Sequence, residues 1–181
     1  MSLYGDYKHS FTLSKEYDKE FFDTVGDLYF TGEVQGMKIY PQHATVNRLD
    51  HITSVTYLSY VVCGKLGLDR VSAARGAVLH DLFYYDWHDG DWSHRPHGYR
   101  HPGFAAENAK ILNPALTKKE ENIIRRHMWP LTVLPPSSPE GFVVSLCDKY
   151  CATAELIRAK REKMTEKHTP FSDKSKGADE R

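Results

Sequence analysis

Apolar residues recur at steps of three and four along most of this chain, and that spacing restricts it to helices. In the range 14–29, for example, the large apolar side chains fall on one helical face: Tyr17, Phe21, Val25 and Leu28. No pair of segments alternates between apolar and polar residues as two strands of a sheet would. The sequence therefore predicts an all-α fold.

Capping residues and helix breakers set the expected boundaries. Asp69 is a good N-cap, and Thr117 and Glu120 have the spacing of a capping box. The expected helices cover residues 14–29, 45–67, 70–83, 101–113, 118–128 and 140–163. Residues 84–100 show no helical period and are crowded with aromatic, His, Asp and Arg residues, so we expect a long loop there. Long loops inside compact domains are often functional.

Composition excludes several classes of protein. The 181 residues suit one domain, and 24 Lys and Arg against 24 Asp and Glu argue against a dedicated nucleic-acid binder. No run approaches the roughly 18 apolar residues that a bilayer requires, so no membrane partner is expected. The N-terminus lacks the pattern of a secretory signal. With three cysteines, a fold held together by disulfide bonds is not expected. A cytoplasmic location is the simplest expectation.

Histidine content is the feature that composition leaves unexplained, because six of the ten histidines lie between positions 80 and 127. Several histidines and aspartates fall on or beside the apolar faces of expected helices: His51, His80, Asp81, His101, His127 and Asp148. A buried unpaired carboxylate costs on the order of several kcal/mol even after relaxation. A shared divalent cation would satisfy all six groups, and mixed imidazole and carboxylate ligands suit Fe, Mn, Ni or Zn.

Each of these residues also has a reading without metal. A lone histidine on an apolar face is more often a hydrogen-bonded core residue, and Asp148 could pair with a lysine. Six such residues from five helices favour a metal site over those readings. Because six ligands exceed the needs of one ordinary site, two metals are expected, with Asp81 bridging them through its two oxygens. This hypothesis requires Asp148 and His101 to lie within about 6 Å of the His80 and Asp81 side chains.

The order of these residues resembles the HD-domain superfamily of metal-dependent phosphohydrolases, and one bacterial branch of it in particular. Five stretches carry the resemblance: "NRLDHITSV", "AARGAVLHDLFYYDWH", "HPGFAAENA", "IIRRHMWPL" and "SLCDKYCATAE". The resemblance covers the range 42–155 and implies a helical bundle of five or more core helices. It divides the chain into an N-terminal helical extension (1–40), a metal-binding helical domain (41–165) and a flexible tail (166–181).

The resemblance also implies ligand sets. One metal would take His51, His80, Asp81 and Asp148, and a second would take Asp81, His101 and His127. Hydrolysis of a phosphate ester, such as a nucleotide, would then use a metal-activated hydroxide positioned by Asp81. We assign leaving-group protonation to His88 only because it lies near His80 and Asp81 in sequence.

Four further residues are candidates for binding the substrate: Arg48, Lys149, Arg100 and Trp87. Arg48 and Lys149 could contact phosphate or pair with acidic neighbours, and Trp87 could stack on a base or anchor the loop. His101, at the expected start of a helix, would favour an anionic substrate because backbone N–H groups are unsatisfied there. The apolar positions of the N-terminal segment, including Tyr4, Tyr7 and Phe11, could pack on the core or on a second subunit in a homodimer.

Two other functions remain open at this stage. Diiron oxygenases of the HD type use nearly the same ligands to cleave carbon bonds, and oxygen uptake would distinguish them from a hydrolase that releases phosphate. A non-catalytic module with one structural zinc is the third hypothesis, although structural sites are usually closed and four-coordinate.

Overall fold

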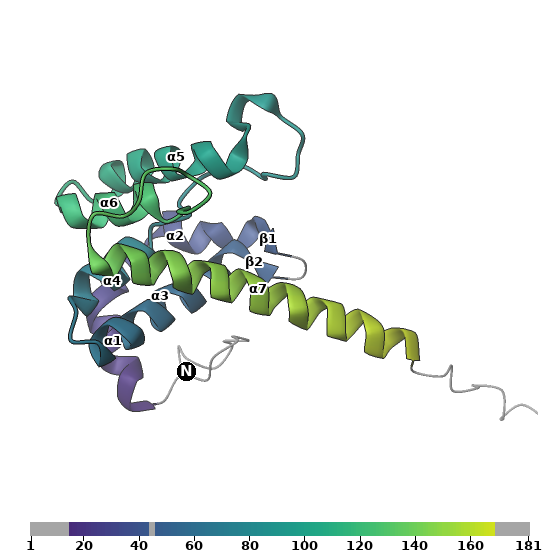
Figure 1. Cartoon of the computed structure of the whole chain (residues 1–181), viewed down its shortest axis with the longest axis horizontal. Coiled ribbons are helices and arrows are strands. Elements are labelled where there is room, and N and C mark those ends of the chain that lie inside the picture. Colours follow the sequence, from purple (N-terminus) through teal and green to yellow (C-terminus); the bar gives the residue numbers. More distant parts are fainter. Residues whose placement is uncertain (1–14, 44–45, 169–181) are drawn as a thin grey trace, which may run out of the picture.

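The computed structural model describes residues 15–43 and 46–168, and Figure 1 shows them as a helical bundle. The predicted all-α class is confirmed. The elements are α1 (Lys15–Tyr29), α2 (Gly32–Gln35), 3-10 helix η1 (Gly36–Ile39), β1 (Pro41–His43), β2 (Val46–Asn47), α3 (Arg48–Lys65), α4 (Arg70–Ala77), 3-10 helix η2 (Trp92–His94), α5 (His97–Leu112), α6 (Lys118–Arg126) and α7 (Pro139–His168). β1 and β2 form a minimal antiparallel pair, which is too short for an alternating pattern to reveal.

Two predicted helix starts are confirmed by their caps. The Asp69 side chain accepts a hydrogen bond from the Ser72 backbone, and Thr117 and Glu120 form the expected capping box. These caps orient α4 and α6, whose C-terminal ends carry candidate ligands.

The segment around residues 84–100 differs from the prediction at both ends. α4 ends at Ala77 rather than at 83, and α5 begins at His97 rather than at His101, with Pro102 inside the helix. The sequence indicated a first-turn proline, but the helix starts a full turn earlier. Gly98, in the first turn of α5, lets the Leu131 side chain pack close to the helix, because a Cβ there would lie 2.7 Å from it.

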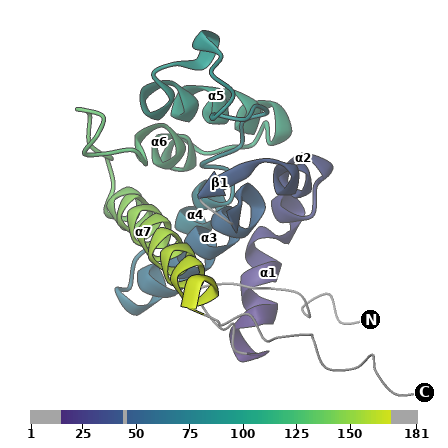
Figure 2. The same cartoon turned by 90° about the vertical axis from the view of Figure 1, so that its right-hand side faces the viewer.

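The helices form two layers, which Figure 1 and Figure 2 show from two directions. α5 and α6 pair in one layer, while α3, α4 and α7 form the other, with α1 on its outer side. Phe21, Val25 and Leu28 of α1 are buried as predicted, and Phe21 packs edge-on against Tyr57 and Tyr60 of α3. Tyr4, Tyr7 and Phe11 lie outside the described residues.

The last element, α7, begins against α3 and α6 and then extends beyond the bundle (Figure 1). It continues to His168, past the predicted end at 163 and into the segment expected as a flexible tail. Among the described residues, no helix is both long enough and apolar enough to cross a bilayer.

Candidate metal centre

All six predicted ligands meet between the two helical layers. His51 comes from α3, His80 and Asp81 follow α4, His101 is in α5, His127 ends α6 and Asp148 is in α7. Each is buried, with an exposed fraction of 8% or less. The layers place ligands from five helices, far apart in sequence, around one point in the interior.

Asp81 lies at the middle of the cluster, with its two oxygens facing different histidines. Oδ1 is 3.2 Å from His101 Nε2 and 3.7 Å from His127 Nε2. Oδ2 is 3.6 Å from His80 Nε2 and accepts a 2.6 Å hydrogen bond from the Gln42 amide. This single carboxylate therefore joins two groups of imidazoles.

Asp148 completes the side of the cluster that holds His51 and His80. Its Oδ1 lies 3.1 Å from His51 Nε2 and 3.9 Å from His80 Nε2. With the 3.2 Å contact between His101 and Asp81, these distances fall inside the limit that the metal hypothesis required.

The outer nitrogen of each imidazole is anchored, which fixes where its other nitrogen points. Nδ1 donates to the Ala77 carbonyl in His80, to the His97 carbonyl in His101 and to the Ile124 carbonyl in His127. A carbonyl can only accept, so in these rings the neutral form carries its lone pair on Nε2, facing the cluster. Outer hydrogen bonds of this kind are typical of histidines that bind metals.

Two observations show that protein groups alone leave the cluster unsatisfied. His80 Nε2 and Asp81 Oδ1 are buried without a hydrogen-bond partner among the described residues. His101 Nε2 and His127 Nε2 lie 2.9 Å apart, and two lone pairs at that distance repel unless a proton or a cation lies between them. The buried groups His51, His80, Asp81 and Asp81, His101, His127 each bring their ligand atoms close enough to hold a metal ion. The N and O donors fit divalent transition metals, without specifying which metal or how many.

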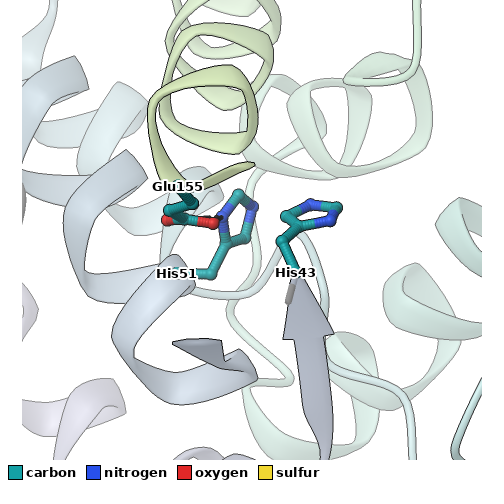
Figure 3. Close-up of side chains that lie close together, drawn as sticks. All are labelled: His43, His51 and Glu155. Atoms are coloured by element: carbon teal, nitrogen blue, oxygen red, sulfur yellow. Dashed lines mark hydrogen bonds and ion pairs between the residues drawn. The ribbon is translucent and has the colours of Figure 1, made fainter. Parts of the chain in front are cut away.

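His51 differs from the other three histidines because its outer partner is a carboxylate. Both oxygens of Glu155 lie 3.1 Å from His51 Nδ1, and Figure 3 shows the imidazole between Glu155 of α7 and His43 of β1. His43, His51 and Glu155 form a third group with spacing suited to a metal. Since His51 Nε2 already faces Asp148, we assign Glu155 to orienting His51.

Three residues of this centre were not predicted from the sequence: Glu155, His43 and Gln42. Glu155 follows Asp148 by seven residues, so both lie on one face of α7, and that spacing could have identified it. His43 and Gln42 lie on β1, a strand too short to produce a pattern.

The buried imidazoles and carboxylates of the cluster shift one another's pKa values. Burial alone would lower the pKa of His51, but hydrogen bonds with Asp148 and Glu155 raise it to about 10. Burial disfavours the charged form of Asp81, yet His80, His101 and His127 hold its pKa well below the usual value. Burial and the neighbouring His101 and His80 lower the pKa of His127 to about 3. Burial also disfavours the charged form of Asp148, but the hydrogen bond with His51 and the nearby His80 hold its pKa below the usual value. Asp81 and Asp148 are thus both ionised and available to bind a cation.

A cavity of about 370 Å³ opens onto the centre. It exposes Asp81, His101, His127 and Asp148, and its other walls are Gln42, His43, Trp87, His97, Gly98, Met128, Lys149 and Ala152. Lys149 supplies the cationic side chain among these walls. Its Nζ donates to the His127 carbonyl at 2.8 Å and lies 3.6 Å from Asp148 Oδ2.

Of the predicted substrate residues, Lys149 and Trp87 line this cavity and the other two do not. Arg48 is wholly buried and donates to Gln42 and to the carbonyls of Phe83 and Tyr85, so it ties the fold together rather than contacting phosphate or forming a surface ion pair. Arg100 is exposed over the Phe104 ring.

Two further expectations need correction. His88 does not line this cavity; it is exposed, its Nδ1 pairs with Asp86 at 2.8 Å and its ring contacts Trp87 at a centroid distance of 3.8 Å. His101 lies a turn inside α5, not at its N-terminus, so free backbone N–H groups do not surround it. His101 therefore lies at no helix end that would attract an anion.

Comparisons of this chain with family models, with curated proteins and with solved structures find no match. The geometry of the cluster and the chemistry of its residues therefore carry the functional interpretation.

Proposed function

We propose that this chain is a cytoplasmic, metal-dependent phosphohydrolase of the HD-domain type that acts on a small phosphate ester. The observation that carries the proposal is the position of Asp81, whose two oxygens face separate groups of buried imidazole Nε2 atoms. Paired divalent cations bridged by a carboxylate are a recurring arrangement in enzymes that hydrolyse phosphate esters. Three free, buried cysteines agree with a reducing compartment.

His51, His80, Asp81 and Asp148 would hold one cation, and Asp81, His101 and His127 would hold the second. Bound divalent cations lower the pKa of water toward about 7 and offset charge on phosphoryl oxygens. The chain itself orients Asp81 through the Gln42 amide and fixes the imidazoles through their Nδ1 hydrogen bonds. The ligands are therefore preorganised before substrate arrives.

Lys149 would attract and hold the anionic substrate. Its ammonium lies at the wall of the cavity, anchored by the His127 and Ser145 carbonyls. Apart from its open side, the cavity lies between two helical layers, where a lower local dielectric strengthens contacts between Lys149 and a phosphate.

The test combines elemental analysis of the purified protein with a screen of phosphate esters for phosphate release. We expect divalent transition metal in the protein and phosphate release that a chelator abolishes and added metal restores. Oxygen uptake coupled to loss of substrate carbon would replace the hydrolase with the oxygenase hypothesis. One zinc per chain, with no release from any ester, would support a structural metal instead.

A further inference from the structure

One polar side chain at the metal centre has no role in the proposed function: His43, the last residue of β1. Its half-buried imidazole lines the cavity of the centre, where Lys149 is the cationic wall. Figure 3 shows His43 projecting from the end of β1 beside the His51 ring. A side chain in this position contacts a molecule that enters the cavity.

An irregularity in the strand pair determines where this side chain points. Adjacent residues of a regular strand point to opposite faces. β1 has one residue more than β2 between the pairs Pro41–Asn47 and His43–Val46, so its side chains do not alternate regularly. Gln42 and His43 both line the cavity although they are consecutive in sequence. Bulges that redirect a side chain in this way are frequent next to functional sites.

His43 also differs from the other histidines of the cavity because nothing anchors its nitrogens. His97, His101 and His127 each use Nδ1 in a hydrogen bond. Within residues 15–43 and 46–168, His43 has no hydrogen-bond or ion-pair partner, and its ring packs edge-on against His51 at a centroid distance of 5.1 Å. An imidazole has at least one N–H donor in either protonation state. His43 therefore offers a donor that the fold does not use.

The nearby carboxylate of Glu155 does not take up this donor. One ligand atom of His43 lies within 4.8 Å of ligand atoms of Glu155 and His51, which is close enough for a shared cation. Both Glu155 oxygens, however, already lie 3.1 Å from His51 Nδ1, so that pair is satisfied without a cation. An anion in the cavity is the ligand that still needs donors, and Lys149 supplies one of them.

We propose that His43 binds the phosphoryl group of the substrate by donating a ring N–H to a phosphoryl oxygen. Lys149 acts with it, so that donors from β1 and α7 hold the group from two walls of the cavity. Hydrogen bonds to an ionised acceptor are the stronger kind, and the lower local dielectric between the helical layers strengthens them further. This inference rests on the proposed function, because that function places a phosphate ester in the cavity.

The first test measures binding without turnover. Inorganic phosphate is titrated calorimetrically into the metal-loaded protein, and into its variants His43→Ala and His43→Gln. Losing a hydrogen bond to a charged group should weaken phosphate binding by His43→Ala roughly 10- to 150-fold. A Gln side chain also carries an N–H donor, so His43→Gln should restore most of the affinity. Absence of phosphate binding by the unmodified protein, or equal affinity in all three proteins, would overturn the assignment.

Bound metal is measured in the same proteins, because His43 belongs to a group with spacing suited to a cation. We expect His43→Ala to keep its metal content. A loss of one metal per chain would show that His43 is a metal ligand and would overturn its role as a phosphate donor.

Gln35→Ala is the control for a loss of side-chain hydrogen bonding elsewhere. Gln35 is a half-buried residue of α2 whose amide donates to the Tyr29 carbonyl, and it does not line the cavity. The phosphate affinity and metal content of Gln35→Ala should equal those of the unmodified protein. An affinity as low as that of His43→Ala would show that the effect at His43 is not specific to the cavity.

Turnover separates this inference from the proposed function. Steady-state hydrolysis of p-nitrophenyl phosphate gives kcat and KM for the same proteins. We expect His43→Ala to raise KM by a factor similar to its loss of phosphate affinity, with kcat unchanged, because the bond to the phosphoryl group is present before and during the reaction. Phosphate binding that depends on His43, without hydrolysis of any ester, would support the role of His43 and contradict the hydrolase. Hydrolysis with the same KM in His43→Ala and in the unmodified protein would do the reverse.

Discussion

The metal centre adjoins a second cavity, the aromatic pocket, yet the two are built in opposite ways. The walls of this pocket are Trp87, His88, Trp92, Arg95, Pro96 and His97. The centre consists of buried side chains from five helices, and its imidazoles are fixed by hydrogen bonds to helix backbone or to Glu155. The pocket consists mostly of half-exposed and exposed rings from the segment between α4 and α5, with His97 from the start of α5, and local aspartate turns hold that segment. Reaction chemistry needs fixed geometry, whereas substrate choice tolerates a surface segment that can vary. This difference in construction predicts that a mutation in the centre or in the pocket can leave the properties of the other region unchanged.

The largest effect is expected from Asp81→Asn. The amide keeps the shape of the carboxylate but loses the charge that joins the two imidazole groups. Phosphate release should fall by more than the roughly 10- to 100-fold that is typical of losing an outer-shell partner, and bound metal should decrease.

Asp23→Asn is the control for this substitution, because Asp23 is an exposed aspartate of α1 that pairs with Lys19 away from the centre. Phosphate assays and elemental analysis measure both variants. Full turnover by Asp81→Asn would remove the carboxylate-bridged centre from the mechanism.

The second largest effect is expected at Arg48, which connects the two regions. Its guanidinium lies 3.6 Å from the Phe83 ring centroid and donates to Gln42, Phe83 and Tyr85. Arg48→Met would leave three acceptors without their donor, at a cost of about 3 kcal/mol or more in the free energy of unfolding. Urea denaturation measures this cost, with exposed Arg100→Met as control. A loss no greater than that of Arg100→Met would show that Arg48 does not brace the segment.

A smaller effect, confined to the centre, is expected from Glu155→Gln. The amide can still accept from His51 Nδ1, but it removes the negative charge that strengthens His51 as a ligand. Metal affinity should fall about tenfold, at the low end of the range for an outer-shell partner. Competition with a chelating dye measures the affinity, and KM for the phosphate ester at saturating metal should not change.

Glu162→Gln is the matched control for Glu155→Gln, because Glu162 lies two turns further along α7 and pairs with Arg158 in solvent. Equal metal affinities for the two variants would show that His51 does not need Glu155.

The sequence predicted the centre better than the pocket, for a physical reason. Helical period alone indicates that His51, His127 and Asp148 face the interior, since apolar neighbours at steps of three and four fix that face. The capping box at Thr117 similarly sets the start of α6 nine residues before it ends at Arg126. Such local signals do not depend on the tertiary structure.

The segment of residues 84–96 carries no such period, so its side chains take positions that only tertiary contacts decide. His88 was predicted to act in the chemistry because it lies near His80 in sequence, but it is exposed, pairs with Asp86 and does not line the cavity of the centre. Arg48 lies one turn before His51 and was a candidate for contacting phosphate. Its hydrogen bonds to the Phe83 and Tyr85 carbonyls join residues far apart in sequence, so they form only in the folded chain. Sequence distance is a poor guide where no helix relates the residues.

The smallest effect is expected at Asp69, which caps α4 and lies outside both regions. Hydrogen bonds from the Ser72 backbone and hydroxyl, together with Lys119, lower the pKa of Asp69 from 3.8 to about 2. Since the folded pKa is the lower one, the stabilisation is complete above about pH 4 and is lost as the pH falls toward 2.

Asp69→Asn keeps an acceptor for Ser72 but has no charge. It should cost less than about 1 kcal/mol in the free energy of unfolding at pH 7, because solvent screens the pair with Lys119. Urea denaturation at pH 7 and pH 2.5 should show this difference in the free energy of unfolding shrinking in acid, with metal affinity unchanged at pH 7. A difference that persists at pH 2.5 would mean that the cap acts through its shape and not its charge.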